Sequence, residues 1–122
     1  MSTENLKVLI VEDNLVNQMV LSKILKSKGC VTDLAQDGIE AVEKALEQEH
    51  DLILMDVQMP GKNGIEATME IRKSKPDKPI IIALTASALG EDKNQCLQAG
   101  MNDYLTKPIA KDQLEMMMQK WF

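Results

Sequence analysis

Short runs of apolar residues alternate along this chain with longer segments in which apolar residues recur every three or four positions. The runs have the length and β-branched content of strands, and the longer segments have the periodicity of amphipathic helices. Asn14 and Asp37 are suited to cap helices, and Gly29 is suited to end one. The predicted strands are 7–11, 31–35, 52–55, 80–84 and 104–106. The predicted helices are 15–28, one that begins after Asp37, 65–73, 88–99 and 111–121.

This succession of strands and helices predicts an α/β fold. We expect a flavodoxin-like (βα)5 domain with a doubly wound, five-stranded parallel sheet and helices on both faces. Right-handed crossovers leave few strand orders, and we adopt the order 2-1-3-4-5 by analogy with known sheets of this kind. One domain is expected at 6–122, after a polar leader at 1–5. Ligands of such sheets bind outside the carboxyl ends of the strands, near the switch point between the first and third strands.

Composition and charge exclude several classes of function. The chain has 122 residues, with 14 basic and 19 acidic side chains and a formal net charge of −5. This charge repels phosphate backbones and anionic lipid, so we expect neither a nucleic-acid nor a membrane partner. Aromatic residues make up 2% of the chain, which is too few for stacked bases or flavin rings. No apolar run is long enough to span a bilayer, and we expect a soluble, cytoplasmic protein.

Spacing within the predicted helices separates core positions from surface positions. In the last helix, Met116 and Phe122 lie off the apolar stripe and are predicted to be exposed. The sole histidine, His50, is predicted to lie at the surface, and Cys30 and Cys96 are expected to pack as small apolar residues. The residues predicted for the helix core faces are Val20, Leu21, Ile24 and Leu25; Ile39, Val42, Ala45 and Leu46; and Leu114, Met117, Met118 and Trp121.

Five chemically active side chains follow the predicted strands: Glu12, Asp13, Asp56, Thr85 and Lys107. Two carboxylates about 4 Å apart repel each other by roughly 4 kcal/mol at an effective dielectric constant near 20. Three carboxylates that converge at one edge therefore favour a bound cation, and hard oxygen ligands suit Mg²⁺ or Mn²⁺. A carboxylate beside a cation and a lysine can act as a nucleophile towards phosphorus, and Thr85 can donate to a phosphoryl oxygen.

The residues at four strand ends resemble the signature segments of response-regulator receiver domains. Each segment is a weak signal alone, but the four together, in this order and at these strand ends, are specific. The resemblance covers residues 6–121, and the residues of these motifs are most similar to those of receivers in hybrid sensor histidine kinases. The segments are Val11-Glu12-Asp13-Asn14, Leu54-Met55-Asp56-Val57-Gln58-Met59-Pro60, Leu84-Thr85-Ala86 and Leu105-Thr106-Lys107-Pro108.

This resemblance implies a two-component phosphorelay receiver with Mg²⁺ as cofactor, Mn²⁺ being a possible substitute. Asp56 would accept a phosphoryl group from a phosphohistidine of a partner protein, and Lys107 would contact that group. Asp13 would bind the metal directly, Glu12 mostly through water, and Gln58 through its backbone carbonyl. The domain would catalyse its own phosphorylation and slow dephosphorylation, without being a turnover enzyme in the ordinary sense.

The resemblance also implies a conformational switch. Thr85 would move towards the phosphoryl group and Tyr104 would change rotamer, which would remodel the surface of 88–99, 104–106 and 111–121. This surface could also form a weak dimer. Gln58 and Ser87 would flank the path of the attacking water.

The implied partner is a histidine kinase or a histidine phosphotransfer protein. Leu15 and Met19, together with Pro108, are the expected partner-binding residues. The peptide bond between Lys107 and Pro108 is expected to be cis, because among peptide bonds only those to proline adopt the cis form readily.

The chain departs from the family pattern at two positions. Family members often have Asp where this chain has Asn63, and many have Asp where it has Glu12.

Other classes remain as alternatives. A flavin-binding module of the same fold requires a hydroxyl- and glycine-rich loop after the first strand, where this chain has two acidic residues. A haloacid-dehalogenase-like phosphatase requires Asp-x-Asp after its first strand and a cap domain, and we identify neither in this sequence. A receiver-like interaction module that is never phosphorylated is the alternative function. The sequence leaves open whether the chain is a stand-alone regulator or a receiver of a larger kinase.

Overall fold

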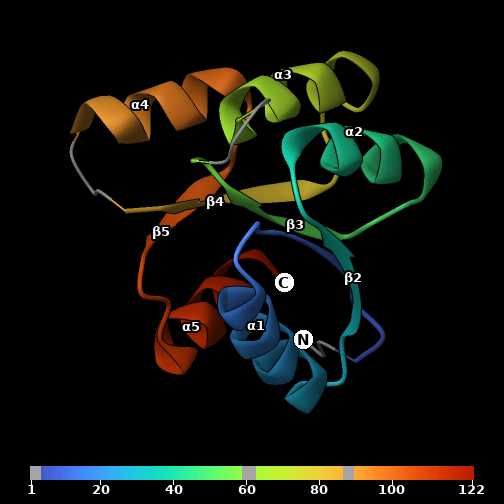
Figure 1. Ribbon diagram of the computed structural model, residues 1–122, viewed down its shortest axis with the longest axis vertical. Coiled ribbons are helices and arrows are strands. Elements are labelled where there is room, and N and C mark those ends of the chain that lie inside the picture. The colour runs from blue at the N-terminus through green and yellow to red at the C-terminus, as the bar shows by residue number, and fades with distance from the viewer. Residues whose placement is uncertain (1–3, 59–62, 87–89) are drawn as a thin grey trace.

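The computed structural model describes residues 4–58, 63–86 and 90–122, and strands and helices alternate through them (Figure 1). The strands are β1 (Lys7–Val11), β2 (Val31–Ala35), β3 (Leu52–Asp56), β4 (Ile80–Thr85) and β5 (Asp103–Thr106). The helices are α1 (Leu15–Ser27), α2 (Gly38–Glu47), α3 (Gly64–Ser74), α4 (Gly90–Ala99) and α5 (Lys111–Trp121). The element order predicted from the pattern is confirmed.

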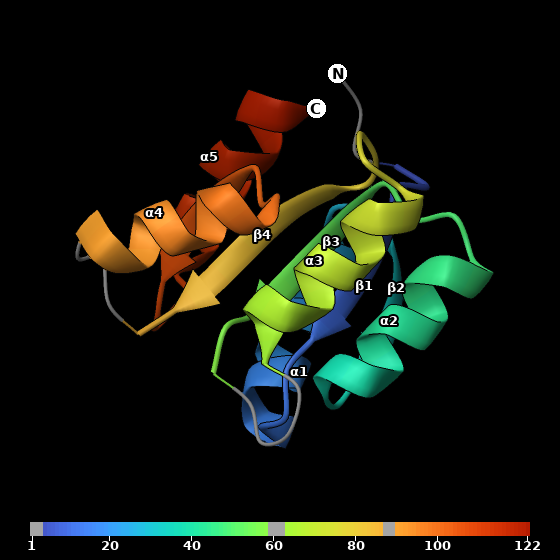
Figure 2. The same ribbon diagram turned by 90° about the horizontal axis from the view of Figure 1, so that it is seen from above.

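All strand pairs are parallel and the order is β2-β1-β3-β4-β5, as expected. Helices α2, α3 and α4 cover one face of the sheet, and α1 and α5 cover the other (Figures 1 and 2). From β1 the chain first goes to β2 on one side of it, and then crosses back to β3 on the other side and continues to β4 and β5. The direction in which strands are added therefore reverses between β1 and β3. The carboxyl ends of these two strands form the expected switch point.

Two apolar clusters hold the helices to the sheet, one on each face. Alternate residues of one strand contribute to different clusters: Leu9 and Val11 pack beneath α2 and α3, whereas Val8 and Ile10 pack against α1 and α5. Strand β3 is buried at every position. This two-sided burial explains why the inner strands are continuous apolar runs.

Asparagine and aspartate side chains cap the N-termini of α1 and α2. Asn14 accepts a hydrogen bond from Asn17 N at 3.0 Å, and Asp37 accepts one from Glu40 N at 2.8 Å. These are the two predicted caps. Gly29 follows α1 with a φ of +83°, a conformation that favours glycine, and so ends the helix as expected.

Three residues predicted to face the core are instead exposed. Val20, Ile39 and Leu46 have exposed fractions of 46%, 56% and 42%. In α2 the small residues Ala41 and Ala45 lie against the sheet, so the helix packs closely and its larger neighbours remain outside. The predictions for these three residues are wrong because each helix buries a narrower stripe than the spacing suggests. The buried residues are Gln18, Leu21 and Leu25 in α1 and Gly38, Ala41 and Ala45 in α2.

The predicted stripe on α5 is confirmed, with Leu114 and Met118 fully buried and Met116 exposed. The prediction for Phe122 is wrong, because this residue is partly buried against the α1–α5 cluster. Cys30 and Cys96 are buried and are not joined by a disulfide, as expected of small apolar packing residues.

The prediction that His50 lies at the surface is also wrong. Its side chain is 3% exposed, and its Nε2 lies 3.6 Å from Asp33 Oδ2. The next residue, Asp51, is exposed and exchanges backbone and side-chain hydrogen bonds with Lys7, which fixes the segment so that His50 faces inward. Burial lowers the pKa of His50, and the nearby Asp33 acts against this. Within the described residues, none of the helices has the length and apolar character needed to cross a membrane.

Candidate functional site

The five predicted side chains lie at the carboxyl edge of the sheet, each at a strand end. Glu12 and Asp13 follow β1, Asp56 ends β3, Thr85 ends β4, and Lys107 follows β5. Strands β1 and β3 are direct neighbours, with Val11 paired to Met55, so Glu12 and Asp56 come side by side. The prediction that these residues gather at one edge is confirmed.

Lys107 forms the centre of the charged group. Its Nζ lies 3.1 Å from Glu12 Oε2 and 3.0 Å from Asp56 Oδ2, and both carboxylates are almost completely buried. Apart from this ion pairing, neither oxygen receives a hydrogen bond from the described residues. The peptide bond that follows Lys107 is cis, as expected. Two buried carboxylates therefore share one ammonium group.

This arrangement perturbs the ionisation of the site. Burial raises the pKa of Asp56 to about 6, and the neighbouring charge of Glu12 adds to the rise, while Lys107 opposes it. Burial acts to lower the pKa of Lys107, but the hydrogen bonds and charges of Asp56 and Glu12 outweigh it and raise that pKa. Lys107 therefore stays protonated, and Asp56 ionises near neutral pH.

The acidic residues at this edge can hold a divalent cation. Carboxylate oxygens of Glu12, Asp13 and Asp56 all lie within 4.8 Å of one another. Asp13 is exposed, whereas the other two are buried with an oxygen that lacks a hydrogen-bond donor. Gln58 N donates to Asp56 Oδ1 at 3.1 Å, which holds the chain after β3 close to the carboxylate. Hard oxygen ligands in this number suit Mg²⁺ or Mn²⁺.

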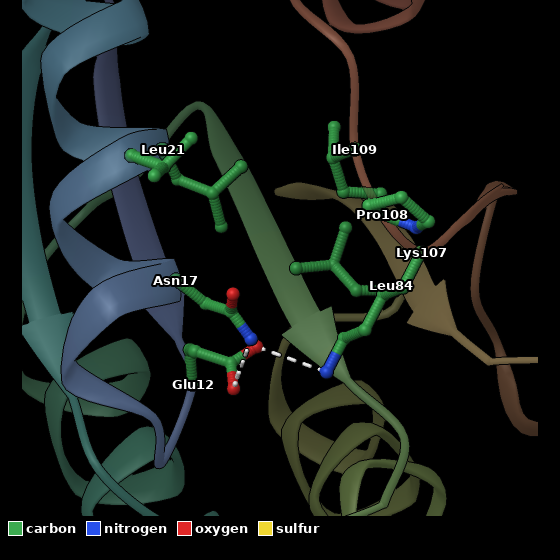
Figure 3. A pocket seen from close by; sticks show the side chains of 8 residues that line it. Glu12, Asn17, Leu21, Leu84, Lys107, Pro108 and Ile109 are labelled. Carbon is green, nitrogen blue, oxygen red and sulfur yellow. Dashed lines mark hydrogen bonds and ion pairs between the residues drawn. The ribbon is translucent and has the colours of Figure 1, made fainter.

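The first turn of α1 contributes residues that the sequence analysis did not identify. Asn17 Nδ2 donates to Glu12 Oε1 at 3.4 Å (Figure 3). Gln18 Nε2 donates to the backbone oxygen of Glu12. Gln18 is 5% exposed and shares the buried face of α1 with Leu21 and Leu25. A polar residue within an apolar stripe was the signal that could have revealed it.

The turn after β3 approaches the site through Gly64. A Cβ atom at this position would lie 2.2 Å from the backbone oxygen of Asp56, so no side chain fits. Asn63 caps α3 in a capping box with Glu66. Residues 59–62 of the predicted turn lie outside the described residues.

Thr85 and Tyr104 lie on the neighbouring pair of strands. Thr85 is buried and pairs with Thr106, and Tyr104 pairs with Ala83. The ammonium of Lys93 in α4 lies 5.2 Å from the centre of the Tyr104 ring. Ser87, predicted to flank the water path, lies outside the described residues.

The surface beside the site is apolar. Leu15 and Met19 have exposed fractions of 67% and 71%. Pro108 lines a cavity of about 350 Å³ between α1 and the loop after β5, with the polar ends of Glu12 and Lys107 at one side (Figure 3). Pro108 therefore lies beside Glu12 and Lys107, and Leu15 and Met19 are exposed on α1.

Comparison with known proteins is consistent with this geometry. The model of the response regulator receiver domain family matches residues 8–119. The chain is 45% identical to hybrid signal transduction histidine kinase B of Dictyostelium discoideum over 93% of the chain, and 39% identical to response regulator mcs4 of Schizosaccharomyces pombe over 95%. It spans only 6% and 27% of the lengths of these two relatives.

Two solved structures are similar throughout. One is the receiver domain of a Pseudomonas aeruginosa sensor histidine kinase with magnesium coordinated in its active site cleft; identity is 47% and the TM-score 0.88, over 96% of this chain and 97% of that one. The other is the receiver domain of the Saccharomyces cerevisiae response regulator Ssk1 in complex with the histidine phosphotransfer protein Ypd1. Identity is 40% and the TM-score 0.91, over 97% of this chain and 89% of that one.

Proposed function

The chain belongs to the response regulator receiver domain family, and from this premise we propose that Asp56 accepts a phosphoryl group from a phosphohistidine of a partner protein. The observation that carries the proposal is the position of Asp56, which is 2% exposed at the switch point and 3.0 Å from Lys107 Nζ. Its Oδ2 contacts the Lys107 ammonium alone among the described residues, and a carboxylate beside an ammonium group can act as a nucleophile towards phosphorus.

The transfer exchanges one bond to phosphorus for another. An Asp56 carboxylate oxygen attacks the phosphorus atom, the phosphorus–nitrogen bond of the phosphohistidine breaks, and its electron pair returns to the imidazole. Lys107 would neutralise the charge of the transferring group, and its position 3.0 Å from Asp56 Oδ2 supports this role. Thr85 would donate a hydrogen bond to the group. Hydrolysis reverses the modification when water attacks phosphorus and releases the Asp56 carboxylate and inorganic phosphate.

Asp13, Asp56 and the backbone carbonyl of Gln58 would hold Mg²⁺, with Glu12 acting mostly through water. The three close carboxylates, two of them buried with a single ammonium group between them, support this assignment, as does the magnesium in the similar Pseudomonas receiver. When bound, the ion supplies positive charge that stabilises the transferring phosphoryl group. Mn²⁺ satisfies the same ligands.

The phosphodonor would be a histidine kinase or a histidine phosphotransfer protein that docks on α1 and on the loop after β5. The exposed Leu15 and Met19, and Pro108 beside the charged site, support this surface, and the yeast complex with a histidine phosphotransfer protein supports this class of partner. The whole protein would be a hybrid kinase or a response regulator, as its relatives are.

Phosphorylation would switch the α4–β5–α5 surface through Thr85 and Tyr104. The exposed Met116 on this surface is available for a weak dimer. The net charge of −5 argues against direct contact with nucleic acid. Two buried cysteines without a disulfide are typical of the reducing cytoplasm, where the domain would lie.

Intact mass after incubation with acetyl phosphate tests the proposal. Wild type with Mg²⁺ should gain one phosphoryl group, and wild type with EDTA should gain none. Asp56→Asn should gain none under either condition, whereas the control Asp77→Asn, an exposed aspartate, should behave as wild type. Absence of a gain in wild type would instead favour an interaction module that is not phosphorylated.

A further inference from the structure

The N-terminus of α1 is joined to the acidic site by a set of hydrogen bonds. Glu12 Oε1 accepts from the backbone nitrogen of Asn14 at 3.2 Å and from Asn17 Nδ2 at 3.4 Å. The other carboxylate oxygen, Oε2, is thereby directed to Lys107 and the site (Figure 3). The start of α1 therefore supplies two of the contacts that orient the Glu12 carboxylate, and Lys107 supplies another.

Comparison with α3 shows what is particular to this helix end. Both helices begin with an asparagine cap, and in α3 the third helical residue, Glu66, closes a capping box by accepting from the backbone nitrogen of Asn63. In α1 the third helical residue is Asn17, and the corresponding backbone nitrogen, of Asn14, donates to Glu12 instead. An amide at this position can donate to Glu12, whereas a carboxylate would repel it.

Gln18 fixes the backbone beneath this arrangement. Its side chain is buried and donates to the backbone oxygen of Glu12, so α1 holds both the main chain and the side chain of that residue. The first turn of α1 is thus attached to the acidic site at two points, while its outer face presents the exposed Leu15 and Met19.

We propose that Asn17 is a positioning residue that orients the Glu12 carboxylate for the bound divalent cation. The inference rests on the proposed function, because it concerns the same acidic site. Partners that orient a metal-ligating group from outside the ligand shell typically contribute about tenfold or more to metal affinity. The Asn17–Glu12 bond is long, so we expect the lower end of that range.

Calorimetric titration with Mg²⁺ tests this role in wild type, Asn17→Ala and Asn17→Gln. The first variant should bind Mg²⁺ about tenfold more weakly, whereas Asn17→Gln keeps an amide donor and should recover affinity to within about threefold of wild type. Alanine is a better helix former than asparagine, so the melting temperature of Asn17→Ala should not fall. The matched control is Asn94→Ala, the same substitution at an exposed position of α4, which should bind Mg²⁺ as wild type does.

Phosphorylation by acetyl phosphate distinguishes positioning from direct participation. At saturating Mg²⁺ the rate for Asn17→Ala should return to that of wild type, because only metal binding is weakened. Unchanged Mg²⁺ affinity in Asn17→Ala, or a rate deficit that persists at saturation, would overturn the inference. If wild type itself bound no Mg²⁺ and gained no phosphoryl group, the proposed function would fail; if it did both and Asn17→Ala matched it, only the inference would.

Discussion

Replacement of Asp56 by asparagine should make the metal-free protein more stable at neutral pH. A carboxyl group whose pKa rises from 3.8 in the unfolded chain to about 6 in the fold lowers the free energy of unfolding by about 3 kcal/mol above pH 6. The group is 2% exposed, so solvent screening relieves little of this cost. Asparagine has nearly the same shape as aspartate and carries no charge, but it is not attracted to the Lys107 ammonium. We therefore expect the free energy of unfolding of Asp56→Asn to exceed that of wild type by about 1 to 3 kcal/mol.

The pH dependence gives the sign of the effect. Because the folded protein binds the Asp56 proton more tightly than the unfolded chain, the cost is complete above pH 6 and disappears below pH 3.8. At pH 4.5 the contribution of the shift should have decreased to about 1 kcal/mol. Added Mg²⁺ should also narrow the difference at pH 7.5, because it binds folded wild type more tightly than the variant.

Urea unfolding in EDTA measures these differences. The single tryptophan, Trp121, is partly buried and can report the transition by fluorescence. The exposed Asp77→Asn serves as a control and should change the free energy of unfolding by no more than about 0.5 kcal/mol. Asp56→Asn that proved less stable than wild type at pH 7.5, or a difference that did not shrink at pH 4.5, would refute the reasoning.

Further predictions concern other parts of the fold. Gly64→Ala should lower the free energy of unfolding by about 1 to 3 kcal/mol and slow phosphorylation, because its Cβ would displace the Asp56 backbone; urea unfolding and intact mass measure the two effects. The pKa of His50 is lowered by burial, so its stabilising effect is present above pH 6.5 and lost as pH falls; His50→Gln should flatten the stability profile of wild type between pH 7 and 5. Leu15→Asp combined with Met19→Asp should reduce transfer from a histidine phosphotransfer protein, relative to transfer from acetyl phosphate, by about tenfold or more. An equal ratio in wild type and the double variant would contradict the proposed docking surface.

The sequence predicted the sheet and the strand ends well because both depend on local patterns. Buried inner strands must be continuous apolar runs, and the carboxyl end of each run marks one edge of a parallel sheet. Asp56 and Lys107, 51 positions apart, could therefore be placed together without coordinates. The contact between them at 3.0 Å confirms that placement.

The errors arose where three-dimensional context outweighs local pattern. His50 stands between two acidic residues in the sequence, but packing of its segment against β1 and β2 turns it inward. Ile39 and Leu46 of α2 are exposed because Ala41 and Ala45 permit close contact between the helix and the sheet. Gln18 interrupts the apolar stripe of α1, which indicates a buried polar side chain, but the sequence does not indicate its partner because that partner is a backbone oxygen.

The strand register offers a route from the site to the proposed switch. Thr85 ends β4, and two residues earlier Ala83 pairs with Tyr104, so a shift of Thr85 towards Asp56 would act on the backbone beside that ring. The Lys93 ammonium, 5.2 Å from the ring, holds Tyr104 by about 0.5–1 kcal/mol if the contact is typical of exposed cation–π pairs. A unit charge about 4 Å away interacts by roughly 4 kcal/mol at an effective dielectric constant near 20. A new phosphoryl charge on Asp56 would therefore supply more energy at the site than this contact supplies at the ring. Tyr104 also packs against the apolar cluster beneath α2 and α3, so the proposed rotamer change has to overcome that packing as well as the cation–π contact.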